Sequence, residues 1–124
     1  MKRSLLLIGV LLLTSLPPAW GQKATERFIP IGESPGLSDG RTLIGMIARV
    51  DLPSRTITVA LEGEGQGISV VTERTRIWLD RSPLKLPNVR GSMADLVPGR
   101  WMEAKPVSPD RPEAEWVKIQ LSEP

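Results

Sequence analysis

Short segments in which every second residue is apolar recur from the middle of this chain to its C-terminus. The clearest is 56–62, where Ile57, Val59 and Leu61 alternate with smaller or polar residues. A period of two is that of a β-strand with one buried face. Comparable segments, each bounded by Gly, Pro, Asp or Ser, are 42–50, 68–72, 75–80, 100–107 and 114–121. They predict an all-β fold, a sandwich or a barrel of five or six strands.

The connections between these segments have the composition of turns. Residues 51–55 combine aspartate, proline and serine, which predicts a hairpin turn. Residues 63–67 are rich in glycine, and 81–91 holds two prolines and predicts an extended loop. Ser92 begins a segment, 92–96, that predicts one short helical turn with Ser92 as its N-cap.

Strand parity assigns side chains to the two faces of the predicted sheet. In 42–50 we expect the alternating residues Ile44, Met46, Ala48 and Val50 to face the core. We expect Met102, in 100–107, to face inward as well.

The N-terminus has the features of an export signal. Lys2 and Arg3 precede an apolar run at 5–13, two prolines follow at 17–18, and Ala19-Trp20-Gly21 offers small residues at a cleavage site. We therefore expect a signal peptide at 1–21 and a periplasmic or secreted protein. The alternative is an uncleaved anchor. The apolar stretch 5–16 falls short of the roughly 20 residues that span a bilayer, so we expect no stable membrane anchor after cleavage.

Two further regions follow the signal. Residues 22–40 are rich in Gly, Pro, Ser and charge and predict a flexible leader, in which the apolar cluster 28–31 is a candidate for docking onto the domain. Residues 41–122 form the predicted β-domain. Removing Lys2 and Arg3 takes the net charge from +2 to zero. Nucleic-acid binding needs a basic surface, so we expect no nucleic-acid partner.

The chain contains no cysteine, histidine or tyrosine. These absences exclude a thiol nucleophile, an imidazole base, a disulfide and zinc sites built from cysteine and histidine. No pair of carboxylates stands out as an acid/base couple. We therefore expect a protein that is not an enzyme, with no cofactor and no metal site.

The order of several phrases resembles that of small exported bacterial β-barrel domains of the oligonucleotide/oligosaccharide-binding (OB) type, many of them of unknown function. The phrases are Gly45-Met46-Ile47 through Asp51 to Thr56-Ile57-Thr58-Val59, then Thr75-Arg76-Ile77, then Ala94-Asp95-Leu96-Val97-Pro98-Gly99, then Ala114 to Ile119. The resemblance spans about 41–121 and implies a small OB-like barrel. Such barrels have many unrelated functions, so it implies little about activity.

The first hairpin is also distantly similar to that of periplasmic copper-binding barrels. That resemblance implies a metal site made of a histidine, methionines and a capping tryptophan. This chain has no histidine and no Trp-Pro-X-Met-Thr-Met-like stretch. Met46, Met93 and Met102 remain as soft ligands, but methionine in a core is commonly filler.

Three tryptophans are the main candidates for a contact surface. Because Ile77 and Leu79 face the core, Trp78 faces away, and the same parity places Trp101 and Trp116 outward. Arg76, Lys105 and Lys118 share this predicted face. One interpretation is structural: the rings stabilise the sheet or are covered by Phe28 and Ile31 of the leader. The other is a platform for a sugar, a peptide or a protein.

Together these features predict an exported, non-enzymatic binding or structural module of the bacterial cell envelope, with an envelope protein or a glycan as its partner. The alternative is a ligand-sensing or ion-handling accessory protein of an envelope system.

Overall fold

The structure is a computed structural model that describes residues 28–122. Its strands are β1 (Leu43–Asp51), β2 (Thr56–Leu61), β3 (Gln66–Val70), β4 (Arg76–Asp80), β5 (Val89–Arg90), β6 (Trp101–Pro106) and β7 (Ala114–Gln120). Two 3-10 turns, η1 (Ser82–Leu84) and η2 (Met93–Asp95), lie between β4 and β6. The all-β prediction is confirmed. The predicted signal peptide and residues 22–27 of the leader lie outside the described residues. Within 28–122, no helix is long and apolar enough to span a bilayer.

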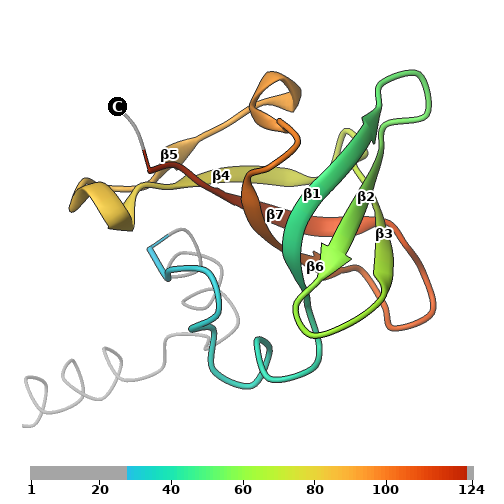
Figure 1. Cartoon of the computed structure of the whole chain (residues 1–124), viewed down its shortest axis with the longest axis horizontal. Helices are drawn as coiled ribbons and strands as arrows, with labels where there is room; N and C mark the ends of the chain where they lie inside the picture. The colour runs from blue at the N-terminus through green and yellow to red at the C-terminus, as the bar shows by residue number, and fades with distance from the viewer. Residues whose placement is uncertain (1–27, 123–124) are drawn as a thin grey trace, which may run out of the picture.

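The seven strands form one sheet in the order β3-β2-β1-β6-β7-β4-β5. Neighbours are antiparallel except β4 and β7, which are parallel. The sheet closes on itself because β3 and β4, near its opposite ends, are consecutive in the chain. The Val70 amide at the end of β3 donates to the Pro112 carbonyl just before β7, at 2.8 Å. Thr75 Oγ1 donates to the Ala114 carbonyl at 2.7 Å. The result is a small barrel with an OB-like strand connection, as Figure 1 shows.

One apolar core fills the barrel. Ile57 and Val59 of β2 are fully buried, as their alternation predicts. Val117 and Ile119 of β7 are fully buried as well, and Met102 of β6 lies among them. The other buried members of this core are Ile47, Val71, Ile77, Leu79, Leu96, Ala104 and Ala114. Strand parity therefore assigned the inner face of four strands correctly.

The predicted parity of β1 is wrong in its first half. Ile47 is buried and Met46 is 46% exposed, although Met46 was expected to face the core. The reason lies one residue earlier, at Gly45, where a Cβ would meet the Ala60 carbonyl oxygen at 2.1 Å. A bulge then shifts the register between residues 47 and 49, so Val50 packs against the core as expected.

The predicted connections are largely confirmed. The 51–55 turn closes with a bond from the Arg55 amide to the Leu52 carbonyl (3.1 Å), and Arg55 adopts a left-handed conformation, with φ of 55°. The predicted helical turn is η2, in which the Ser92 amide donates to the Asp95 carboxylate at 2.8 Å. The predicted loop 81–91 differs in holding η1, with Pro83 in its first turn, and the two-residue β5 on the edge of β4.

The segment before β1, residues 28–42, is here called the arm. It forms successive turns and lies against the outer face of β4, β6 and β7, below the barrel in Figure 1. The outer face of β1, β2 and β3 is left uncovered by the described residues of the arm.

Candidate functional site

The two outer halves of the barrel differ in what covers them. One half, the outer face of β4, β6 and β7, carries the predicted tryptophans. Trp78 and Trp116 lie on the outer face, as parity predicts, because their strand neighbours fill the core. They are not open to solvent, however: Trp78 is 8% exposed and Trp116 only 1%. Trp101 is half-buried at the start of β6. The predicted set therefore does not form one open aromatic platform.

The arm covers this half of the barrel through bonds to two buried carboxylates. Glu103 of β6 accepts three hydrogen bonds from the arm, from the Gly32 amide (3.0 Å), the Ser38 hydroxyl (2.6 Å) and the Thr42 hydroxyl (2.7 Å). Its side chain has no solvent exposure. A buried carboxylate requires this degree of hydrogen bonding to be tolerated. The arm is therefore part of the folded domain.

Asp80, at the end of β4, holds the beginning of the arm in the same way. Its carboxylate accepts from the Ile31 amide at 3.0 Å and from the Ser82 amide at 2.9 Å. Of the two leader residues proposed to cover the tryptophans, Phe28 is 60% exposed, so its ring lies largely in solvent. The contact between the arm and Asp80 is made by the Ile31 backbone.

The predicted cations of this half are engaged as well. Lys118 of β7 is fully buried, with Nζ 4.6 Å from the centroid of the Trp116 ring and 3.3 Å from the Ser34 hydroxyl. Arg76 and Lys105 both pair with Glu115, at 3.4 and 2.9 Å. The structure thus brings five of the six predicted site residues together on one face, around contacts made within the chain. Trp101 lies apart, toward β1.

Metal ligation has little support in these residues. Within 28–122 there is no group of three or more acidic, histidine or cysteine side chains that would hold a metal ion. Met102 is a core residue, and Met93 packs against the same core.

The uncovered half of the barrel carries a surface that parity did not find, here called the β1–β3 face. Met46 of β1 lies opposite Ala60 of β2 on one side and Trp101 of β6 on the other. Ile68 of β3 is 54% exposed. Arg49 of β1 is exposed on the same face. It pairs with Thr58 of β2, which pairs on its other side with Ile68. Other outward positions of β2 and β3 are Thr56, Gln66 and Val70.

This surface was missed because Met46 was assigned to the core. The signal that pointed to it is Gly45, since a glycine inside an alternating segment often marks a bulge or a close backbone approach. Reading inward positions from Gly45 and Ile47 places Met46 outward, next to Trp101.

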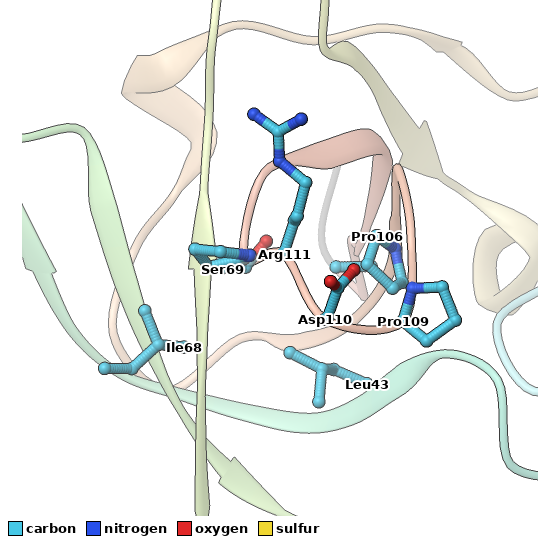
Figure 2. Close-up of a pocket in the computed structure, with 9 residues that line it drawn as sticks. Leu43, Ile68, Ser69, Pro106, Pro109, Asp110 and Arg111 are labelled. Carbon is cyan, nitrogen blue, oxygen red and sulfur yellow. The ribbon is translucent and has the colours of Figure 1, made fainter.

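A hollow lies at one end of the barrel, in the seam between β3 and the loop that joins β6 to β7. Its volume is about 290 Å³. Figure 2 shows Ile68 and Ser69 on the strand side and Pro109, Asp110 and Arg111 on the loop. The other lining residues are Leu43, Ala104, Pro106 and Pro112. A second hollow, of about 630 Å³, shares Leu43, Pro106 and Pro109 with the first and extends to the end of the arm at Arg41.

Comparison with known proteins assigns no family. No protein-family model matches the chain, and no curated protein matches it. Among solved structures the chain is similar to a tryptophan-to-alanine variant of CusF from Escherichia coli with Cu(II), at 14% identity and a TM-score of 0.45, over 64% of this chain and 90% of that chain. It is also similar to CusF with Ag(I), at 14% identity and a TM-score of 0.44, over 63% of this chain and 93% of that chain. The distant resemblance noted in the sequence is matched by a distant structural likeness.

Proposed function

We propose that this chain is an exported, non-enzymatic binding module of the cell envelope whose partner is a protein. Its contact surface is the β1–β3 face, with Trp101 at the margin. The observation that carries this proposal is the exposure of Met46 on β1 and Ile68 on β3, the strands on either side of β2, on the half of the barrel that the arm leaves open.

The chemistry of the face supports a protein rather than a glycan. Sugars stack on exposed aromatic rings, and two of the three tryptophans of the barrel, Trp78 and Trp116, are buried. What the open face offers is a thioether, an isoleucine, part of an indole and the guanidinium of Arg49. Methionine, tryptophan and arginine are the residue types enriched at protein interfaces. Methionine also adapts its shape to a partner surface.

Site-specific photo-crosslinking tests the proposal. A photoreactive amino acid is placed at Met46 or at Ile68 in the full chain, expressed in its native host, and irradiated. We expect one discrete crosslinked species shared by the two positions. Leu52, in the β1–β2 turn, is 64% exposed and is the matched control, and it should not give that species. Equal crosslinking at all three positions, or none at either face position, would overturn the proposal.

The exported state has its own test. Fractionation of the host followed by N-terminal sequencing should find the chain outside the cytoplasm and beginning at Gln22. Recovery of the chain with Met1 in the cytoplasm would contradict it.

A further inference from the structure

Strand β3 has a free edge. In an antiparallel pair, residues alternate between those that bond to the partner strand and those whose N–H and C=O point away from it. The Val71 amide bonds to the Arg55 carbonyl across from β2, at 2.9 Å, and the Val70 amide points the other way, to Pro112. By the same alternation, Ile68 presents its N–H and C=O away from β2. Among residues 28–122, neither group has a partner on that side.

Strand β3 itself carries none of the features that block the addition of another strand. Proteins commonly block a free edge with a lysine, a proline, a bulge or a covering segment. The sequence of β3 is Gln66-Gly67-Ile68-Ser69-Val70, without a charge or a proline. Its register with β2 is also regular from one end to the other. Such an edge is a template for one more strand.

The seam hollow lies beside the free edge and is lined on its inner side by small residues. Ser69 and Ala104 are both almost fully buried, and the nearest atoms to the missing Cβ of neighbouring Gly67 belong to the side chains of Leu43 and Leu61. The volume of about 290 Å³ is near the lower limit of small-ligand pockets, roughly 300–1,000 Å³. An added strand would direct alternate side chains into this space. The opposing rim holds three prolines, which have no N–H to compete for the edge.

The chain's own pairing shows where an added strand would lie. Val70 forms an isolated parallel bridge with Glu113, so the first position of this edge is already occupied by an extended segment. The open positions at Ile68 and Gln66 continue that ladder. A strand added at these positions would run toward Leu43, whose side chain lies next to Gly67. Leu43 also lines the second hollow, so the strand would continue into it.

The positive charges around the second hollow favour an acidic residue in the part of the partner that would lie there. The two hollows are lined by Arg41, Lys105 and Arg111 against the single carboxylate of Asp110. Lys105 and Arg111 are paired with glutamates outside the hollows. Arg41 forms no ion pair with any of residues 28–122 and is exposed at the rim of the second hollow.

We infer that β3 accepts an extended segment of a partner protein as an additional strand, with one apolar side chain seated in the seam hollow and an acidic residue near Arg41. Main-chain bonds to Ile68 supply affinity and the hollow supplies selectivity. A single strand fits a seam that the 107–113 loop borders, whereas the β3 of a second copy would bring its whole barrel against that loop. This inference rests on the proposed function, because it names the kind of partner segment.

A display library of random nonapeptides, selected on the folded chain, provides the probe. Enriched peptides should alternate apolar and polar residues and carry an acidic residue toward one end. Ile68→Pro removes the outward N–H without breaking a bond to β2, a change that edge strands tolerate. It should weaken these peptides by about tenfold or more, as expected for loss of one or more main-chain bonds. Ile68→Thr keeps the N–H and should weaken the peptides less than Ile68→Pro does, since it loses apolar contact but no main-chain bond.

Two further measurements keep the test decisive if Ile68→Pro does not fold. Amide hydrogen exchange at Ile68 should be fast in the free chain and slowed by a selected peptide. Arg41→Glu should weaken peptides that carry the acidic residue and leave their glutamine versions unchanged. No enrichment, equal binding to the Pro and Thr variants, or unchanged exchange at Ile68 would overturn strand addition.

The outcomes separate this inference from the proposed function. A shared crosslink at Met46 and Ile68 without any edge-dependent peptide would support a protein partner and overturn strand addition. Edge-dependent peptides without that crosslink would support strand addition and overturn the β1–β3 face as the contact surface. A dimer seen by sedimentation that Ile68→Pro dissociates would make a second copy the occupant and overturn the partner segment.

Discussion

The two outer halves of this barrel reverse the usual distribution of residues. Beneath the arm, on β4, β6 and β7, the charged residues Asp80, Glu103 and Lys118 are fully buried. On the open half, Met46 and Ile68 are about half-exposed. Buried charges are tolerated only with hydrogen-bonding partners, and the arm supplies them from its backbone and hydroxyls. The comparison indicates that the covered half holds its own chain, whereas the open half makes no such contacts with the arm and is the surface on which the proposed binding depends.

The largest effect should come from the carboxylate that holds the arm. Glu103→Ala removes the acceptor of the Gly32, Ser38 and Thr42 bonds and takes a carboxylate away from the fully buried Lys118, its partner residue on β7. We expect the free energy of unfolding to fall by about 3 kcal/mol or more, measured by urea denaturation. Glu62→Ala, at an exposed glutamate, is the control and should stay within about 0.5 kcal/mol. Equal losses in the two variants would remove the distinction between the halves.

On the open half, stability depends on backbone packing rather than on the exposed side chains. Gly45→Ala places a Cβ against the Ala60 carbonyl oxygen, where the separation would be 2.1 Å. The two strands must then move apart, and we expect a loss of about 2 kcal/mol. Gly67→Ala is the matched control, because the nearest atoms to its Cβ would be the flexible ends of the Leu43 and Leu61 side chains, at 3.0 and 3.3 Å. A smaller loss for Gly45→Ala than for this control would contradict the account.

These two sites also mark what the sequence could and could not predict. Alternation is a local property, so it identified the strands and the inner face of β2, β4, β6 and β7. It failed in β1 because a close backbone approach at Gly45 and the bulge that follows depend on the neighbouring strand. An alternating pattern contains no information about that strand.

The burial of Trp78 and Trp116 could not be predicted from the sequence for a different reason. Parity correctly placed Trp78 and Trp116 outward, but it could not show what lies over this face, which is Arg90 of β5 above the Trp78 ring and the arm bonded to Asp80, Glu103 and Lys118. The arm bonds to residues 49 to 84 positions away, such as Asp80 from Ile31 and Lys118 from Ser34. The arm has no strand or helix period, and such contacts follow from the whole fold. The seam hollow likewise exists only once β3 and the 107–113 loop are brought together.

A smaller effect is expected at the margin of the covered half, where charges are only partly buried. Glu115 pairs with Lys105 and Arg76 while its side chain remains 37% exposed. Pairs of this kind contribute about 0.2–1 kcal/mol and are screened by salt. Glu115→Gln should therefore lower the free energy of unfolding by no more than about 1 kcal/mol, and the difference from the native chain should shrink in 1 M salt. A large loss that does not depend on salt would contradict this expectation and would mean that Glu115 belongs to the buried charge network of Asp80, Glu103 and Lys118.

The smallest effect is expected at Met46, and it tests the division between the halves most directly. Met46 and Ile47 are adjacent in β1, yet one is 46% exposed and the other 1%. Met46→Ser should change the free energy of unfolding by less than about 0.5 kcal/mol, whereas Ile47→Ala should lower it by about 2–5 kcal/mol, both measured in urea. The simple alternation of 42–50 predicts the reverse order. A costly Met46→Ser with a mild Ile47→Ala would restore that parity, close the open face and remove the surface on which the proposed binding depends.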